Sequence, residues 1–320
     1  MAYETAIMPT NYAITTHWNA FRHSSGEEMI EEIVSELDLH HVELGYDLRI
    51  DLVPGVKRMV SEGVVQVDSL HNFCPVPIGA PRGHPELFVM GSLNRRVREA
   101  AIAHTTKTIK FAAELGAKVV VCHAGNVEMR KLTGKLIELS LDGKQFSPPY
   151  ERCKDKLLVR REKKAKAYFD HLCTSVETLL PVLDAAGVAL AFENLPTWEA
   201  IPTEKEMETL ARRFDSPRLR YWHDFGHGQI RHNLGLSAHF QCLQKLLPWL
   251  AGFHIHDVNP PAHDHLMPPE GNIDFNAFAS LVPDDALKVF EPAPGLPAEV
   301  VRQGIDKVRN AWEASATTTS

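Results

Sequence analysis

The 320-residue chain lacks the features that mark secreted and membrane proteins. Its five cysteines are odd in number and form no Cys-x-x-Cys pair, which disfavours both a disulfide framework and a zinc ribbon. No stretch approaches the roughly 18 uninterrupted apolar residues of a membrane span. The first residues also lack the basic start and long apolar run of a signal peptide. These absences indicate a reducing compartment without a membrane anchor, so a cytoplasmic location is expected.

Basic residues are fewer than acidic ones. The chain has 41 acidic residues against 34 lysines and arginines, which gives a formal net charge of −7 and an isoelectric point near 6.2. Because phosphate backbones are held by clustered lysine and arginine, a nucleic-acid partner is disfavoured. The hydrophobic content of 44% and charged content of 23% are those of a folded globular protein.

Short apolar runs alternate with helix-like patterns along the whole chain. Strands are predicted at residues 12–16, 40–44, 64–70, 117–122, 188–192, 219–223, 251–255 and 286–290. Helices are predicted at residues 26–37, 50–62, 93–115, 157–186, 203–213, 235–247, 274–281 and 296–313. Strict alternation of this kind is typical of an α/β fold, the (β/α)8 TIM barrel. We therefore predict a single barrel domain over residues 1–313 and a disordered tail over residues 314–320.

A TIM barrel typically takes about 250 residues, so this chain carries extra segments. The main predicted insertion follows the fourth strand, at about residues 124–157, and a second, rich in proline and glycine, spans residues 71–92. The first contains Pro148 and Pro149 and runs into a basic helical segment. Its composition is compatible with a solvated surface loop and also with a lid or oligomer arm over the barrel mouth.

Acidic and histidine side chains close a series of the predicted strands at the same end. The series is His71, His123, Glu193, Asp224, His254 and Glu291. The last four are 31 (193 to 224), 30 (224 to 254) and 37 (254 to 291) residues apart, which is one strand–helix unit each. Four charged groups buried in one small space repel one another unless a cation joins them. We therefore predict that these last four side chains hold a divalent metal ion.

Several histidines border this set, and their roles stay open. His71 and His123 are either metal ligands or groups that hydrogen-bond a substrate. His227 completes an Asp-x-x-His motif and is expected beside Asp224. His256 is two positions beyond His254, so the two side chains point the same way in an extended strand. The pattern does not show which of the two is the ligand.

Three residues near the first strands also have two interpretations each. His17 and Trp18, at the end of the first strand, either line a sugar pocket or pack in the core. Glu43, in the VELGYD motif, either contacts substrate or forms a salt bridge inside the barrel mouth.

Taken together, the motifs resemble those of the xylose isomerase-like TIM-barrel superfamily, which includes sugar phosphate isomerases and epimerases and endonuclease IV. The resemblance spans residues 12 to 310, except that it is weakest at 124–157. It is carried by VELGYD, the strand-end His71, HAGN with His123, FEN with Glu193, D-x-x-H at 224–227, HIHD at 254–257 and VFEP with Glu291.

In the ketose epimerases of this group the resemblance implies one divalent metal on Glu193, Asp224, His254 and Glu291. Manganese is favoured, with zinc, cobalt, iron and magnesium as alternatives. The resemblance also implies substrate contact by His227. Candidate substrate contacts are His227, His123, His71, His256 and Trp18.

The endonuclease IV branch implies more than one metal. There the equivalents of His71, His123 and Glu193 hold one zinc, the epimerase-like set holds a second, and the equivalent of His227 with a D-x-H element holds a third. This chain has His-Asp-His at 263–265 in place of D-x-H. The candidate second metal set is His71, His123 and His265.

The leading hypothesis is a metal-dependent isomerase or epimerase that removes the α-proton of a sugar or polyol through an enediolate. Glu193 and Glu291 are the candidate catalytic base and acid. A lyase or dehydratase of the same family, acting on a keto-sugar or keto-glycoside, shares that first step. The alternative is a multi-zinc phosphoesterase like endonuclease IV, and a non-catalytic sugar-binding role is least favoured because both glutamates are present. Homo-oligomers are common for this fold, so self-association is expected.

Overall fold

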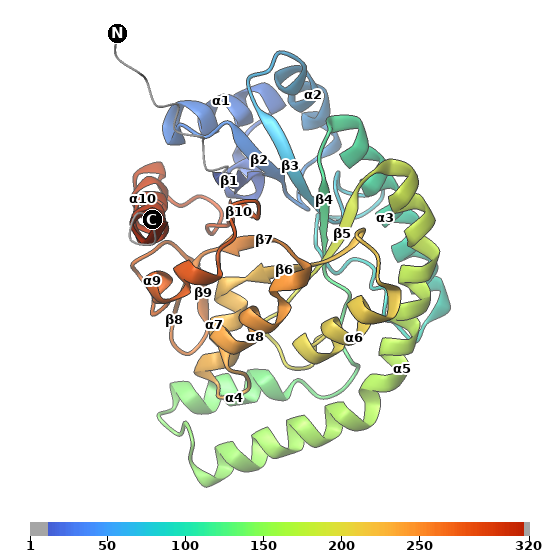
Figure 1. Ribbon diagram of the computed structural model, residues 1–320, viewed down its shortest axis with the longest axis vertical. Helices are drawn as coiled ribbons and strands as arrows, with labels where there is room; N and C mark the ends of the chain where they lie inside the picture. The colour runs from blue at the N-terminus through green and yellow to red at the C-terminus, as the bar shows by residue number, and fades with distance from the viewer. Residues whose placement is uncertain (1–11, 317–320) are drawn as a thin grey trace.

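The computed structural model describes residues 12–316, and its central feature is a closed barrel of eight parallel strands (Figure 1). The barrel strands are β1 (Tyr12–Thr15), β2 (His41–Leu44), β3 (Gln66–His71), β4 (Val119–Cys122), β5 (Ala189–Glu193), β6 (Leu219–Asp224), β7 (Leu250–Ile255) and β10 (Leu287–Phe290). Each is hydrogen-bonded in parallel to its neighbours in the order β1-β10-β7-β6-β5-β4-β3-β2. The predicted (β/α)8 fold is confirmed, and each predicted strand ends within two residues of its observed bounds.

Helices cover the outside of the barrel and follow the strands along the chain (Figure 1). They are α1 (Gly26–Leu37), α2 (Val53–Ser61), α3 (Arg95–Leu115), α4 (Leu132–Leu141), α5 (Pro148–Ala186), α6 (Glu204–Phe214), α7 (Phe225–Asn233), α8 (His239–Leu246), α9 (Phe275–Phe278) and α10 (Ala298–Ala316). The side chain of Ser25 caps the first of these helices, and Thr203 with Glu206 forms a capping box on α6. Within residues 12–316, no helix is long and apolar enough to cross a membrane.

The interior of the barrel is a packed apolar layer. Its buried members are Ala13, Val119, Val121, Ala191, Trp222 and Val289. Trp222 is the largest of them and is fully buried. Gly252 on the neighbouring strand makes room for it, because a Cβ atom there would lie 2.5 Å from the indole ring. The barrel is therefore filled, and its polar groups lie above this layer.

Replacing Trp222 by alanine should lower the free energy of unfolding by about 3–5 kcal/mol, because it leaves a large cavity in a layer that cannot collapse. Urea denaturation measures the change. The matched control is Trp249→Ala: that ring is only half-buried, with the guanidinium of Arg212 at 5.2 Å, so its loss should cost less than half as much. Equal losses for the two variants would contradict a Trp222-filled barrel.

The segment predicted as an insertion after the fourth strand is mostly helical. It contains α4 and the first turns of α5, which starts at Pro148 and not at residue 157. The predicted helix start at residue 157 was wrong because Pro148 and Pro149 occupy the first turn of the helix, where the missing N–H group is not needed. The Tyr150 hydroxyl donates a hydrogen bond to the Leu234 carbonyl oxygen at 2.8 Å, so this helical hairpin is tied to the end of α7.

Three smaller predictions also differ from the structure. The helix predicted at 235–247 is preceded by another, α7, which starts directly after Asp224. Between the seventh barrel strand and the helix predicted at 274–281, where no element was predicted, the chain forms an antiparallel hairpin of β8 (Asp257–Asn259) and β9 (His263–Leu266). Finally, α10 continues to Ala316, so residues 314–316 are helical and not a disordered tail; residues 317–320 lie outside the described part.

Candidate metal centre and active site

The predicted ligands lie at the carboxyl ends of four neighbouring strands, β5, β6, β7 and β10. They are Glu193, Asp224, His254 and Glu291. Side chains alternate between the two faces of a strand, so a residue two positions after an inward-facing core residue also faces inward. Asp224 follows Trp222 in this way, and the register places it directly opposite His254. Local alternation therefore points the whole set at the barrel axis.

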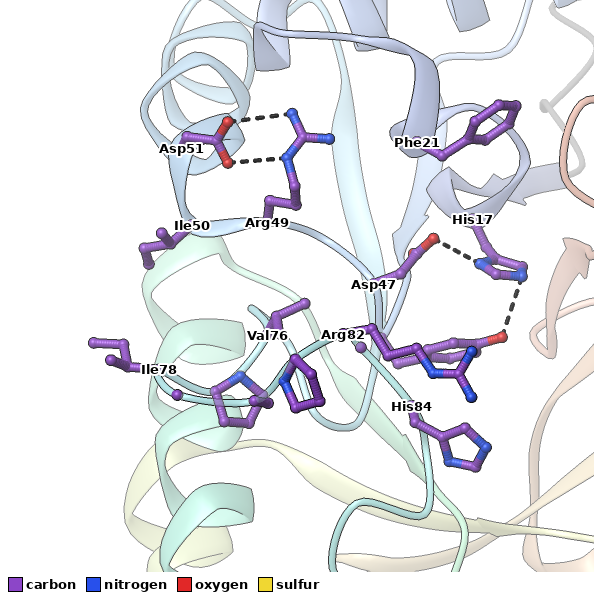
Figure 2. A pocket seen from close by; sticks show the side chains of 16 residues that line it. His17, Phe21, Asp47, Arg49, Ile50, Asp51, Val76, Ile78, Arg82 and His84 are labelled. Atoms are coloured by element: carbon purple, nitrogen blue, oxygen red, sulfur yellow. Dashed lines mark hydrogen bonds and ion pairs between the residues drawn. The ribbon is translucent and has the colours of Figure 1, made fainter.

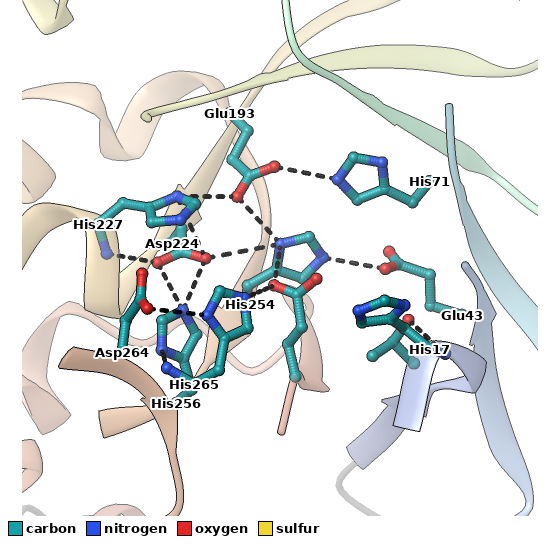
Figure 3. A network of polar contacts seen from close by, with 12 residues as sticks. His17, Glu43, His71, Glu193, Asp224, His227, His254, His256, Asp264 and His265 are labelled. Carbon is teal, nitrogen blue, oxygen red and sulfur yellow. Dashed lines mark hydrogen bonds and ion pairs between the residues drawn. The ribbon is translucent and has the colours of Figure 1, made fainter. Parts of the chain in front are cut away.

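Glu193, Asp224 and His254 point toward one another (Figure 3), and Glu291 completes the group. One ligand atom from each lies within 4.8 Å of those of the other three. The Nδ1 atom of His254 is 3.3 Å from Glu193 Oε1, 3.2 Å from Glu291 Oε2 and 3.8 Å from Asp224 Oδ2. All four residues are buried, with at most 4% of their surface exposed. Three carboxylates and one imidazole in this space fit the donor preferences of a divalent cation.

Glu43 orients the imidazole of this cluster. Its Oε1 atom is 3.0 Å from Nε2 of His254, and its other oxygen accepts a hydrogen bond from the Ser69 hydroxyl at 2.7 Å. Glu43 is fully buried, so of its two predicted roles the structure has the salt bridge inside the barrel mouth. A carboxylate on the far nitrogen fixes the ring so that Nδ1 faces the other three side chains.

The charges of the cluster compensate one another. Burial alone would raise the pKa of Asp224. The imidazoles of His227 and His256 outweigh this effect and lower the pKa to about 2. Burial likewise raises the pKa of Glu193, and the imidazoles of His254 and His123 bring it well below its ordinary value. The carboxylates are therefore ionised at neutral pH.

The pKa values of two histidines shift upward instead. Burial lowers the pKa of His254, but Glu291, Glu43 and Glu193 raise it well above its ordinary value. For His227, burial lowers the pKa, and Asp224 and Glu193 raise it to about 9. Imidazolium groups thus supply the positive charge that a bound cation would replace.

Cation binding should release about one proton at pH 7, because His254 must lose its proton to become a ligand. Below the raised pKa of His254 the cation competes with that proton, so apparent affinity should rise about tenfold per pH unit and level off above it. Calorimetric titration with Mn²⁺ in buffers of different ionisation enthalpy measures the proton release. Glu43→Gln should release fewer protons, since a carboxylate that raises this pKa is gone; a buffer-independent enthalpy for the unaltered protein would contradict the prediction.

His71 and His123 lie against the same carboxylate from the other side. Their Nε2 atoms are 3.3 and 2.9 Å from Glu193 Oε2. These three residues form a second group that could hold a cation, with Glu193 shared between the two groups. His71 is buried, whereas His123 is partly exposed to the cavity described below.

His227 lies beside Asp224, as predicted from the D-x-x-H spacing. Its backbone N–H donates to Asp224 Oδ1 at 2.6 Å, so the carboxylate also caps α7. Its Nδ1 atom is 3.2 Å from Glu193 Oε1. Asn194, in the FEN motif, steadies this pair: its side-chain oxygen accepts the Asp224 N–H at 2.8 Å and its amide donates to the Asp224 carbonyl oxygen at 3.0 Å.

His256 is not placed to contact a substrate, contrary to the prediction. It is fully buried; its Nε2 atom is 3.1 Å from Asp224, and its Nδ1 atom accepts the N–H of His265 at 2.9 Å. The ring packs directly on α7 at Gly226, where a Cβ atom would lie 1.9 Å from it. Glycine at this position of the DFGH motif is explained by that close approach.

Two further site predictions are corrected by the structure. His265 does not gather with His71 and His123; it groups with His256 and Glu291, with its ring stacked 4.2 Å from that of His256. The reason is the β8–β9 hairpin, which carries it to the opposite side of the cluster. Trp18 does not line a pocket: it is fully buried, and its indole nitrogen donates to the Leu296 carbonyl oxygen at 2.8 Å.

A hydrogen-bonded chain lies at the rim, and of its members only His17 was considered as a pocket residue from the sequence. The Tyr46 hydroxyl is 3.1 Å from Nε2 of His17, whose Nδ1 is 2.8 Å from Asp47 Oδ2. The Tyr46 ring meets the edge of His71, with 5.2 Å between centroids. The available signal was position, because Tyr46 and Asp47 complete the VELGYD motif directly after β2.

Two cavities open at this rim. The larger, about 880 Å³, lies between residues 46–51 and 76–84 and contains His17 and Asp47 at its inner end (Figure 2). The other, about 760 Å³, reaches His123 and His227, which both contact Glu193. Tyr46 and His84 line both cavities. The second cavity therefore gives access to the cluster.

Comparison with known proteins agrees with this architecture. The sequence profile of the xylose isomerase-like TIM-barrel family matches residues 32–310. An uncharacterized protein of Methanocaldococcus jannaschii is 26% identical over 187 residues, which are 58% of this chain and 53% of that protein, so the chain matches about half of that relative's length.

Solved structures share the fold at low sequence identity. A D-tagatose 3-epimerase-like protein has a TM-score of 0.69 and 15% identity, covering 97% of this chain and 100% of its own. The apo 3-keto-D-glucoside 4-epimerase of E. coli has a TM-score of 0.66 and 16% identity, covering 94% and 99%. The IolI protein, solved with a zinc atom bound, has a TM-score of 0.63 and 13% identity, covering 95% and 98%.

Proposed function

Because the chain belongs to the xylose isomerase-like TIM-barrel family, we propose that it is a divalent-metal-dependent isomerase or epimerase acting on a sugar or polyol. The observation that carries the proposal is the buried cluster of three carboxylates and one imidazole at the barrel mouth. Proteins of the same fold named as ketose epimerases support a small-molecule sugar as the substrate.

Glu193, Asp224, His254 and Glu291 would hold the cation. Their oxygen-rich donor set favours manganese, with zinc, cobalt, iron and magnesium as alternatives. The cation would supply Lewis-acid polarisation of the substrate's carbonyl oxygen and the neighbouring hydroxyl oxygen.

Glu193 and Glu291 both approach Nδ1 of His254, at 3.3 and 3.2 Å, and are the proposed acid–base pair. One carboxylate takes the proton from the carbon next to the carbonyl, and the C–H electron pair remains in an enediolate. The other glutamate, ionised in the resting site, takes up a proton from solvent, passes it to the opposite face of that carbon and so yields an epimer; the first glutamate then releases its proton to solvent. Return to the adjacent carbon yields an isomer. His123 and His227, which face the cavity, would hydrogen-bond the substrate's hydroxyl groups.

A lyase or dehydratase is the nearest alternative, because loss of a group from the β-carbon of a keto-sugar or keto-glycoside begins with the same proton removal. All five cysteines are unpaired, which is consistent with the proposed cytoplasmic location. Self-association stays a prediction.

Metal analysis and isotope exchange test the proposal together. We expect about one manganese ion per chain by mass spectrometry. In D₂O, the Mn²⁺-loaded protein should place deuterium next to the carbonyl of at least one of D-tagatose, D-fructose, L-ribulose or a 3-keto-D-glucoside, as read by NMR. No exchange with any of them by fully metal-loaded protein would overturn it.

A second candidate function has its own supporting observation. His71, His123 and Glu193 form another group that could hold a cation, as a multi-zinc phosphoesterase like endonuclease IV requires. The net charge of −7 argues against a nucleic-acid substrate. Two or three zinc ions per chain, with hydrolysis of bis(p-nitrophenyl) phosphate, would favour this function over sugar isomerisation.

A further inference from the structure

The cavity that reaches the cluster extends well beyond it. It occupies about 760 Å³ and begins at His123 and His227. From there it runs between α4, which contributes Gly134 and Ile137, and the loop after β5, which contributes Leu195 and Pro196. Ligand sites of roughly 300–1,000 Å³ hold drug-sized molecules, so a free ketose would leave much of this one unfilled.

The wall away from the cluster has a mixed but mainly apolar character. Val127, Met129 and Ile137 line it opposite the proline and leucine of the β5 loop. Polar side chains share this wall, among them Glu86, Asn126, Glu128, Lys131 and Thr197. The Asn126 amide donates a hydrogen bond to Glu86 Oε1 at 2.8 Å, which turns both groups toward each other. An apolar wall beyond a hydroxyl-binding centre suits a ligand with a sugar at one end and an apolar group at the other.

The wall is also fixed in place. Glu199, buried in the loop after β5, accepts the backbone N–H groups of Leu132 and Thr133 at 2.6 and 3.0 Å. It thus caps α4, whose own N-cap residue makes no side-chain bond. The Thr133 hydroxyl oxygen accepts the N–H of Trp198 at 3.0 Å. With the Tyr150 hydrogen bond at the other end of the hairpin, these contacts hold α4 against the loop after β5.

We infer that this cavity is an aglycone subsite, so that the substrate is a glycoside of a keto-sugar with an apolar substituent and not a free ketose. The sugar ring would lie at the cluster, and its substituent between α4 and the loop after β5. The subsite rests on the proposed function for its sugar end, whereas its apolar end is defined by the cavity itself.

Gly134 allows a test that leaves the protein's own packing alone. It is exposed on the first turn of α4, and a Cβ atom there would meet no atom within 4 Å. Gly134→Phe should fill the subsite with an aromatic ring, and Gly134→Ala is the matched control at the same position. The probes are methyl and phenyl 3-keto-D-glucosides, with deuterium exchange in the presence of Mn²⁺ as the readout.

We expect kcat/KM for the phenyl compound to exceed that for the methyl compound by about tenfold or more, as for an added apolar group in a pocket. Gly134→Phe should bring this ratio close to one by lowering only the phenyl rate, and Gly134→Ala should keep it. A ratio near one in the unaltered protein, or an unchanged ratio in Gly134→Phe, would overturn the subsite.

Failure of the proposed function can be told apart from failure of the subsite. If neither compound nor any free ketose exchanges deuterium, the proposed function fails, and calorimetric binding of phenyl and methyl glucosides decides the subsite. Preferential binding of the phenyl compound that is lost in Gly134→Phe supports it, and equal binding overturns it.

Discussion

Replacing Glu193 by glutamine should lower the rate of solvent deuterium exchange into the substrate by about 100- to 10,000-fold, and so should Glu291→Gln. Glutamine keeps the volume of each side chain and can still hydrogen-bond to the facing imidazoles. It cannot accept the proton from carbon, and it removes one negative charge from the metal set. Exchange followed by NMR at saturating Mn²⁺ measures the loss.

The matched control is Glu128→Gln. That carboxylate lies at the rim of the same cavity but is exposed and outside the cluster, so its rate should stay within about twofold. Metal content measured on the same samples separates a lost base from a lost cation. Full turnover of a confirmed substrate by both cluster variants would remove Glu193 and Glu291 from the mechanism.

Stripping the cation with a chelator should abolish exchange and lower the melting temperature by several degrees. A ligand that binds only the folded state adds about 2.7 kcal/mol when present at 100 times its Kd. In the cation's absence the buried carboxylates keep only the imidazolium groups as counter-charges. Thermal unfolding with and without Mn²⁺ measures the shift, and activity should return when the ion is added back.

Two variants serve as controls for this shift, one inside the cluster and one at the rim of the cavity. Asp224→Asn should show a much smaller Mn²⁺-dependent shift, because it loses a ligand charge, whereas Glu128→Gln should keep the full shift. An unaltered protein that melts at the same temperature with and without the cation would contradict a metal centre at this place.

Local pattern was sufficient to predict the barrel, because each strand is a short apolar run and each is followed by a helix. The same pattern was insufficient to predict the helices after the fourth strand and before α8. After the fourth strand, Pro148 and Pro149 start a helix instead of interrupting one. The glycine-containing segment that follows Asp224 is helical, and Gly226 and Gly228 leave room there for the rings of His256 and His239. These contacts come from later elements and are not visible in the local pattern.

The site residues also divide into those that the local pattern predicts and those that it does not. The convergence of Glu193, Asp224, His254 and Glu291 could be predicted, since strand alternation and a spacing of one unit are both local properties. His265 was grouped with the wrong partners, because its position depends on the β8–β9 hairpin and not on its spacing. The chain of Tyr46, His17 and Asp47 joins two different loops and has no periodic signal.

By itself, then, the sequence determined the barrel, the end of it that carries the polar side chains, and the residues of the cluster. Tertiary structure alone decided which nitrogen of His254 faces that cluster, because the answer depends on Glu43, 211 residues away along the chain. It also decided that α4 forms one wall of a cavity, since Glu199 fixes that helix from 66 residues further on. Periodicity and spacing describe neighbours along the chain, whereas hydrogen bonds between distant loops exist only once the barrel has closed.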